Sequence, residues 1–318
     1  MGATTTLSSS LVPDDALSVV AMTFKTPQVE LVHYDPYAAE LLIYTKSTRL
    51  QGKQTLDEIK SWPPEKKMEH LDYMRDTIKS SWEFSEYVFE IHGVSREFTH
   101  QFVRTRDMAG VDDPAFGEPD ANFTVASFAQ ESQRTVDASG NGFVLPTSLK
   151  PENVNWFKCS LAEISQDYVH AINRGEPPQN ARALLPTAVA TSIICKASLR
   201  TLHHMAEVRL CTRTQGQYQD VFRIMREKVY EVHPWARGWI EVYCYNTGTC
   251  CFPNYNKCPI QGPLFNPETG LRFDRATVQL TPLGEPWPLR PASRVEIYEA
   301  WETLRHEAVP IAREGKTM

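Results

Sequence analysis

A strand-to-helix junction near residue 95 constrains this chain more than any other segment. Tyr87, Phe89 and Ile91 alternate with their neighbours, a spacing that predicts a β-strand with one buried face. Ser95 follows as a suitable N-cap, and the next residues have helical spacing. We therefore expect a strand that turns directly into a helix over residues 96–106.

Periodic patterns elsewhere predict the remaining elements. In chain order we expect a strand over 29–34, a helix from residue 37, a helix after Pro64 with an apolar stripe of Met68, Leu71, Met74 and Ile78, a helix around 161–172 closed by Gly175, one long helix over 197–229, an irregular proline-rich stretch over 259–291 and a last helix around 295–304.

This helix-rich, mixed order favours an α+β fold with a C-terminal extension. We divide the chain into a disordered or loosely docked tail (1–25), a catalytic domain (26–258) and an extension that wraps the core (259–318). Residues 107–125, rich in Asp, Gly and Pro, break all periodicity and are interpreted as an inserted loop.

Composition excludes several classes of protein. The 318 residues carry a net charge of −6, which argues against a protein that coats nucleic acid, although converging arginines can still hold one phosphate. No apolar run is long enough for a membrane span, and residues 1–15 do not have the pattern of a signal peptide. We predict a cytoplasmic location.

The seven cysteines indicate reduced thiols, because their number is odd and no export signal precedes them. Cys244, Cys250, Cys251 and Cys258 cluster, but their spacings do not match those of structural zinc sites. We expect a packing cluster there and no metal site.

Two polar stretches carry the candidate chemistry. Gln101 and Arg104 stand one helical turn apart, and an amide beside a guanidinium can hold a phosphate or a ribose. A solvated polar face is the simpler alternative for this stretch alone. Beyond the loop, residues 126–136 combine hydrogen-bonding side chains with Arg134, and by themselves they fit either a ligand-closing segment or a capped helix start.

Together these stretches resemble the motif of flavin-dependent thymidylate synthases, in which Gln-x-x-Arg-x-Arg is followed by Ser-x-Arg. The pattern here runs from Gln101 to Arg106 and from Ser132 to Arg134. Two later blocks are similar to the same family: Ala181-Arg182-Ala183-Leu184-Leu185-Pro186, and Arg200-Thr201-Leu202-His203-His204 with Arg209-Leu210-Cys211. The resemblance covers roughly residues 29 to 240.

The resemblance implies a role for each matching residue. A catalytic role falls to Arg209, which would lie against the uracil ring and favour negative charge on it. The nucleotide would be held by Gln101, Arg104, Gln130, Glu131, Ser132, Arg134, Thr135, Arg182 and Arg209. The flavin would be held by Ser80, Thr105, Arg106, Ser198, Arg200 and His204.

The resemblance also implies the partners of the reaction. FAD would deliver the hydride, NADPH would reduce the flavin, and 5,10-methylenetetrahydrofolate would supply the carbon. The family forms homotetramers whose active sites combine several subunits, which allows Arg182 to serve a neighbouring chain's site. For each arginine taken alone, a surface ion pair is the alternative.

Three departures from the family pattern fall in the expected site. Thr105 and Phe84 stand where the family has histidines, and both replacements fall near the expected flavin site. Thr135 replaces a tyrosine beside the sugar, which opens space and offers a hydroxyl.

We therefore expect C5 methylation of UMP and also of dUMP, as in the flavin-dependent UMP methylases of nucleoside-antibiotic pathways such as polyoxin biosynthesis. An ordinary thymidylate synthase and a non-catalytic nucleotide-binding homologue are the alternatives.

Overall fold

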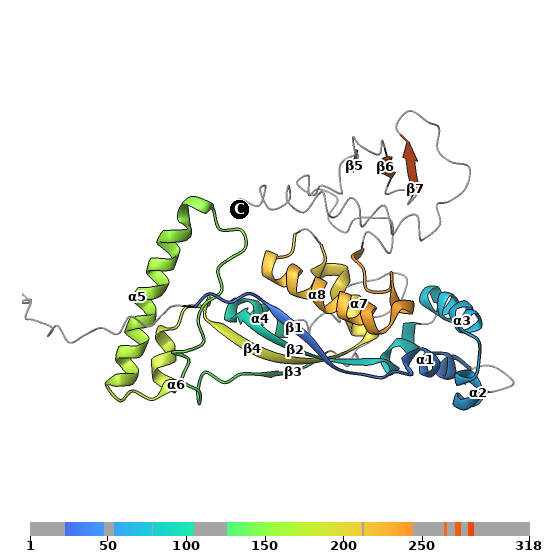
Figure 1. Ribbon diagram of the computed structural model, residues 1–318, viewed down its shortest axis with the longest axis horizontal. Helices are drawn as coiled ribbons and strands as arrows, with labels where there is room; N and C mark the ends of the chain where they lie inside the picture. The colour runs from blue at the N-terminus through green and yellow to red at the C-terminus, as the bar shows by residue number, and fades with distance from the viewer. Residues whose placement is uncertain are drawn as a thin grey trace, which may run out of the picture.

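A four-stranded antiparallel sheet forms the centre of the protein (Figure 1). Its strands are β1 (Gln28–Tyr34), β2 (Glu86–Ser95), β4 (Ala190–Ser198) and β3 (Ser127–Gln130), in that spatial order. The computed structural model describes residues 23–47, 54–77, 79–104, 126–211 and 213–243, and the backbone of three short strands further on.

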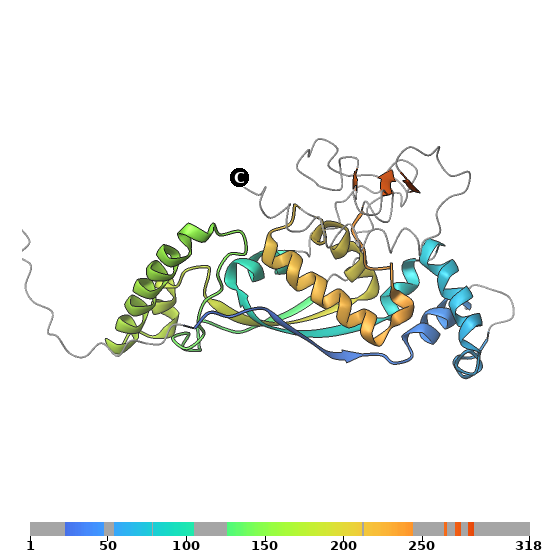
Figure 2. The same ribbon diagram turned by 45° about the horizontal axis from the view of Figure 1, so that its top comes forward.

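Helices cover one face of this sheet. Helices α4 (Arg96–Phe102), α7 (Leu199–Arg209) and α8 (Gly216–Val232) pack on it, as Figures 1 and 2 show. Tyr87, Phe89 and Ile91 have 0% exposure on the covered side, which confirms the predicted strand and its buried face. The core therefore lies between the sheet and these three helices.

The remaining helices lie at the two ends of the sheet (Figure 2). One end carries α1 (Ala38–Ser47), α2 (Leu56–Lys60), α3 (Pro64–Thr77) and the 3-10 helix η1 (Lys79–Phe84). The other carries η3 (Pro151–Asn153), α5 (Val154–Asn173), α6 (Pro178–Ala181) and η4 (Arg182–Leu184), while η5 (Pro234–Ala236) follows α8. Mixed helix and strand confirm the α+β class.

The predicted junction at Ser95 is confirmed, with two changes of detail. The Ser95 hydroxyl accepts a hydrogen bond from the Phe98 amide and so caps α4. The α-helix ends at Phe102, before the expected residue 106. Gly93 interrupts the strand pattern in the sequence but does not end the strand: it lies within β2 at a φ of 64°, where the pairing register shifts. A Cβ there would come within 2.6 Å of the Thr26 carbonyl oxygen, so glycine is required.

Two of the expectations from sequence are corrected by the structure. Residues 127–130 form a strand and not a helix start, because they pair with β4. The long helix over 197–229 is two helices, since its first residues belong to β4 and α7 ends at Arg209. The helical spacing of apolar residues continues from one helix into the next, because α7 and α8 each bury an apolar stripe against the same sheet.

The stripe of α3 is confirmed in part. Leu71 and Met74 are buried, but Met68 is 38% exposed, because only part of α3 is covered by its neighbours. Ile78 lies outside the described residues, as do the 107–125 insertion, the clustered cysteines and the expected last helix.

The proline-rich stretch is not wholly irregular. Its described backbone forms a three-stranded antiparallel sheet of β5 (Leu264–Phe265), β6 (Leu271–Asp274) and β7 (Gln279–Pro282). Within the part of the chain that the structure describes, no helix is both long and apolar enough to cross a bilayer.

Candidate functional site

The first polar motif lies where α4, β3 and α8 meet. The Gln101 amide donates to the Gln215 side-chain oxygen at 2.8 Å, just before α8 begins. Gln130, the last residue of β3, donates to the Thr99 hydroxyl at 2.7 Å. These two bonds hold both halves of the motif at one corner of the sheet. Gln101 and Gln130 are 29 positions apart in sequence, yet Gln101 lies in α4 and Gln130 donates to the same helix.

Three charged side chains, Arg96, Glu131 and Arg182, lie close together at the start of α4. Burial and then the nearby Arg182 guanidinium lower the pKa of Arg96, while Glu131 opposes the shift. Glu131 is held by a 3.0 Å hydrogen bond from the Asn141 amide. Two guanidiniums beside one carboxylate leave excess positive charge, which suits a phosphate.

The turn after β3 carries the most exposed members of the predicted site. Ser132, Arg134 and Thr135 are all exposed to solvent. The Ser132 hydroxyl accepts a 3.3 Å hydrogen bond from the Arg134 amide, which stabilises the turn. Arg104 and Arg182 are also exposed, and the Nε of Arg182 donates to the Gln179 carbonyl. The guanidinium groups of this turn and its neighbours are thus accessible to a ligand.

Three of the residues predicted to hold the flavin, Ser198, Arg200 and His204, lie at the start of α7. The Ser198 hydroxyl caps this helix by accepting from the Thr201 amide. The Arg200 side chain is 14% exposed and donates to Glu83 of η1 at 2.7 Å. Ser80 lies on the same 3-10 helix. Contacts between α7 and η1 thus bring Ser80, Arg200 and His204 to one region.

A network of polar side chains around the buried His203 lies next to these residues. Lys79 donates to Nε2 of His203, and Nδ1 of His203 lies 2.6 Å from the Trp239 carbonyl oxygen. Burial lowers the pKa of His203 to about 4, against an opposing effect of Glu207. The ring is therefore neutral, and Nδ1 carries its proton toward Trp239.

Glu207 connects this network to His204. One carboxylate oxygen lies 3.5 Å from Nδ1 of His204, and the other lies 3.5 Å from His203. Burial alone would raise the pKa of Glu207, but the hydrogen bond from His204 and the charges of its neighbours, including Lys79, hold it below its ordinary value. An ionised Glu207 orients the His204 ring through Nδ1.

Arg209 ends α7 and faces an aromatic ring. Its guanidinium carbon lies 4.5 Å from the centroid of the Tyr218 ring. Its Nε is buried and has no hydrogen-bond acceptor among the residues that the structure describes. The charge is also well placed at the C-terminal end of a helix. A held, partly desolvated cation of this kind is suited to stabilising negative charge on a ligand.

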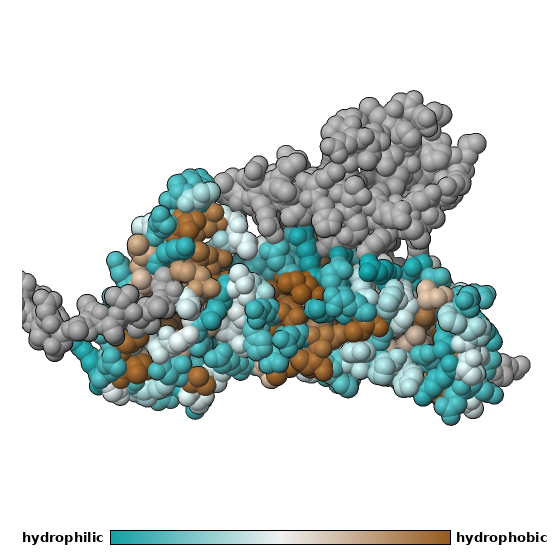
Figure 3. Space-filling view, in the orientation of Figure 1, coloured by the Kyte–Doolittle hydropathy of each residue, from teal (hydrophilic) through white to brown (hydrophobic). Residues whose placement is uncertain are grey.

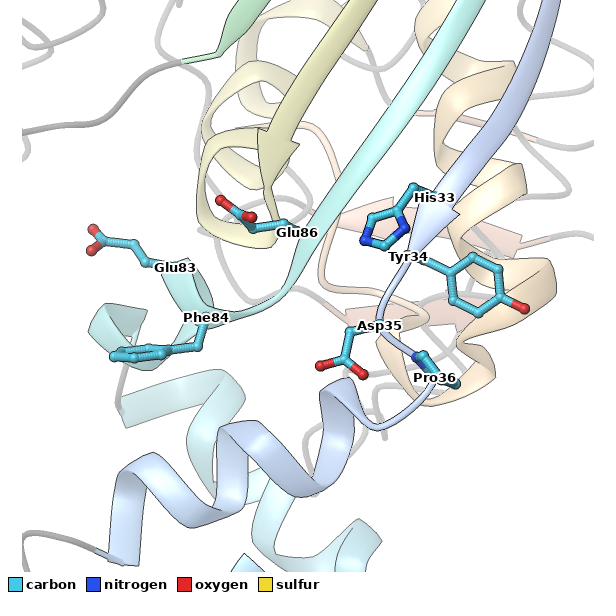
Figure 4. Close-up of a pocket in the computed structure, with 7 residues that line it drawn as sticks. All are labelled: His33, Tyr34, Asp35, Pro36, Glu83, Phe84 and Glu86. Atoms are coloured by element: carbon cyan, nitrogen blue, oxygen red, sulfur yellow. The ribbon is translucent and has the colours of Figure 1, made fainter.

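A pocket of about 530 Å³ opens beside Glu83, the hydrogen-bond partner of Arg200. Figure 4 shows that its residues come from the end of β1 and from the η1–β2 junction. Phe84, a residue that departs from the family pattern, lies at its edge and is 55% exposed. The pocket is lined by His33, Tyr34, Asp35, Pro36, Glu83, Phe84 and Glu86. Its size falls within the range of cofactor sites.

Sequence reasoning missed several of these residues. The run from His33 to Pro36 is a polar and aromatic cluster at a strand end, a signal that could have marked it as a candidate site. Lys79 carries no such signal, because its partner His203 is 124 positions away. Glu207 lies three and four residues from His204 and His203 on one helix, and that spacing could have marked it. Thr105 and Arg106 lie outside the described residues.

A family model described as "Thymidylate synthase complementing protein" matches residues 30–235. The chain belongs to this family. The matched range contains every residue assigned above to the nucleotide and the flavin. The resemblance drawn from the motif is therefore confirmed at the level of the family.

The curated relatives that this chain resembles are described as flavin-dependent thymidylate synthases. A flavin-dependent thymidylate synthase from Pyrococcus furiosus is 29% identical over 239 residues, covering 70% of this chain and 88% of the relative. One from Thermococcus onnurineus is 31% identical over 183 residues, covering 54% of this chain and 67% of the relative. The family match thus extends across most of the relative from Pyrococcus furiosus.

A solved structure shares the fold. The crystal structure of the UMP/dUMP methylase PolB from Streptomyces cacaoi, bound with 5-Br dUMP, aligns with a TM-score of 0.55. The alignment covers 68% of this chain and 95% of that chain at 15% identity. At this identity the likeness shows the fold alone, and it confirms the expected fold of the thymidylate synthase complementing family.

Proposed function

We propose that this protein transfers a one-carbon unit from methylenetetrahydrofolate to C5 of the uracil in UMP and dUMP, with reduced FAD as the hydride donor. The observation that carries the proposal is the state of Arg209: its buried Nε–H has no hydrogen-bond acceptor among the described residues. Family membership and the order of the motif blocks support it.

Arg209 would act on the uracil ring. Carbon C5 becomes nucleophilic when negative charge can develop on the ring oxygens and N3. A fixed guanidinium lowers the energy of that charge distribution, and its effect is largest where water is excluded. Gln101, Arg104, Gln130 and Glu131, with Ser132, Arg134, Thr135 and Arg182, would hold the phosphate and sugar in place.

The residues on α7 and η1 fit a flavin. The Arg200 guanidinium can donate hydrogen bonds to a ligand such as FAD, and the neighbouring pocket offers two aromatic side chains, Tyr34 and Phe84. Ser80, Ser198 and His204 add hydrogen-bonding groups, and Thr105 and Arg106 belong to the same proposed set. When bound, the flavin supplies hydride chemistry that no side chain can supply. The protein's own part is to orient it and to keep His204 in a defined tautomer.

NADPH as the reductant of the flavin and a homotetrameric assembly belong to the same proposal. Apolar side chains remain exposed on the described surface, including Trp156 on α5 at 67% and Ile194 on β4 at 43%. Figure 3 shows brown apolar areas over the central part of the molecule and over α5. Such surfaces support association with further copies of the chain.

The sugar preference rests on Thr135. It is exposed on the turn after β3, so a ribose 2′-hydroxyl can approach without meeting the tyrosine that the family has there. A site that leaves room without demanding a hydrogen bond accepts both sugars. The ordinary thymidylate synthase, which acts on dUMP, is the second candidate, and the names of the curated relatives favour it.

One parallel assay separates these functions. Purified protein is supplied with FAD, NADPH and methylenetetrahydrofolate, and with UMP, dUMP or dCMP in separate reactions. We expect a 5-methylated product from UMP and from dUMP and none from dCMP. Turnover of dUMP with UMP ignored leaves the ordinary thymidylate synthase, while a colourless protein that binds no added FAD leaves the non-catalytic homologue.

A further inference from the structure

Among the described residues, an aromatic ring and not a carboxylate contacts the guanidinium of Arg209. Its carbon lies 4.5 Å from the Tyr218 centroid. No described carboxylate lies within salt-bridge distance of it, and its buried Nε has no described acceptor. An ion pair would offset its charge, whereas a ring face attracts the cation and leaves the charge in place. The contact therefore fixes a cation without neutralising it.

The Tyr218 ring is itself immobilised. It has 0% exposure and meets Phe98 edge-on at 5.1 Å and Phe102 edge-on at 5.6 Å. Phe102 in turn meets Phe128 of β3 at 5.1 Å. Edge-to-face aromatic packing of this kind defines the ring orientation. The plane on which Arg209 rests is thereby tied to α4 and to the sheet.

Hydrogen bonds also connect the end of α7 with the start of α8. Gln219, which is buried, donates from Nε2 to the carbonyl oxygens of Leu210 and Cys211 at 3.0 and 2.9 Å. The Thr214 hydroxyl donates to the Val208 carbonyl at 2.8 Å. These bonds join the end of α7 to the start of α8 and satisfy carbonyls that the helix end leaves open. Arg209 and Tyr218 therefore keep their spacing.

We propose that Tyr218 is a positioning residue for the reaction: its ring face holds the Arg209 guanidinium in the orientation that serves the substrate base. A planar cation stacked on a ring keeps its N–H groups in its own plane, free to meet a ligand edge. Preorganisation of this kind avoids the cost of moving the charge during the reaction. The proposal rests on the function proposed above.

The test compares two buried rings on the same helix. Tyr218→Leu removes the ring under Arg209, and Phe222→Leu removes a fully buried ring one turn later that has no such role. We expect both variants to lose similar unfolding free energy in urea titrations. Only Tyr218→Leu should lower kcat, by at least about tenfold, with KM changed far less. Tyr218→Phe, which keeps the ring, should restore kcat to within about twofold of the original protein.

Equal losses of kcat in the two leucine variants, or no loss in either, would overturn the proposal. If Tyr218→Leu does not fold, phenylalanines with increasing fluorination at position 218 replace it. Fluorine withdraws charge from the ring face with little change in size, so kcat should fall stepwise. A kcat that is indifferent to fluorination also overturns the proposal.

A second measurement does not depend on the reaction. The Nε–H of Arg209 should give a slowly exchanging ¹⁵N NMR signal in the free protein and in Tyr218→Phe, and a fast-exchanging one in Tyr218→Leu. If the NMR result holds while no uracil nucleotide is turned over, the proposed function fails and the positioning contact stands. If turnover is present and the signal is unaffected by Tyr218→Leu, the positioning role fails alone.

Discussion

The two halves of the candidate site differ in how completely the protein organises them. On the side proposed for the flavin, Arg200 is paired with Glu83, and His204 is oriented by Glu207, next to the partly buried Lys79 and the buried His203. On the nucleotide side, Arg134 and Arg182 are exposed on a turn and a short helix. The arginine of the first half thus has a carboxylate partner in the described structure, and the two arginines of the second half face solvent. Arg209, at the end of α7, lies over the Tyr218 ring and has no carboxylate partner among the described residues.

The largest expected effect is the loss of kcat on replacing Arg209. Arg209→Ala should lower kcat by at least about 100-fold, because it removes a preorganised charge partner. The fold should remain intact, since Nε makes no described hydrogen bond and the side chain is not in the core. Steady-state kinetics and far-UV circular dichroism check this, with Arg174→Ala on the far helix as a control. Near-normal kcat in a folded Arg209→Ala protein would contradict the assignment.

The network on the flavin side should give the protein a pH-dependent stability. His203 has an ordinary pKa of 6.5, lowered by burial to about 4 in the folded protein. Between pH 6.5 and about 4, His203 is therefore protonated in the unfolded chain and neutral in the folded chain. The free energy of unfolding consequently falls as the pH drops through this range. At about 1.4 kcal/mol per pH unit, the loss amounts to roughly 3 kcal/mol.

Urea unfolding at pH 7.5, 6.0, 5.0 and 4.5 measures that slope. His203→Gln removes the titrating group while it keeps a side chain able to bond to Lys79 and the Trp239 carbonyl. We expect the difference in unfolding free energy between this variant and the original protein to be largest near neutral pH and to shrink below pH 6.5. Parallel curves for the two proteins would mean that His203 does not titrate as described.

The exposed arginines should affect binding more than stability. Arg134→Ala and Arg182→Ala should each weaken nucleotide affinity by about 1.5–3 kcal/mol, the typical value of a hydrogen bond to a charged group. The unfolding free energy should change little, because both side chains are solvent-exposed. Calorimetric titration with UMP and with uridine tests the phosphate specifically. An equal loss for nucleotide and nucleoside would show that these residues do not contact the phosphate.

The smallest effect is expected at the sugar. Thr135→Tyr should reduce kcat/KM for UMP more than for dUMP, by roughly 3- to 10-fold in the ratio, because the larger ring takes space that the 2′-hydroxyl would use. Thr135→Ser is the matched control, since it keeps the hydroxyl and the space. A ratio that is unchanged in Thr135→Tyr would place the sugar preference elsewhere.

Much of the architecture followed from local pattern. The alternation around Phe89 determined a strand with one buried face, and Ser95 determined where α4 begins, because both depend on neighbouring residues only. The family motif identified Arg134, Arg200 and Arg209 as candidates without a structure. The end of α7 was not predictable in this way, since the bonds from Gln219 to the Leu210 and Cys211 carbonyls interrupt a pattern that continues to look helical.

Only the tertiary structure decided how the candidate residues are held. Glu83 and Arg200 are 117 positions apart, and Lys79 and His203 are 124 apart, yet each pair is in contact. No local period encodes such pairs, because they form only when the sheet brings η1 against α7. The same holds for Arg209 and Tyr218: the sequence supplied an arginine of the right type, and the packing of α7, α4 and α8 set it on a buried ring.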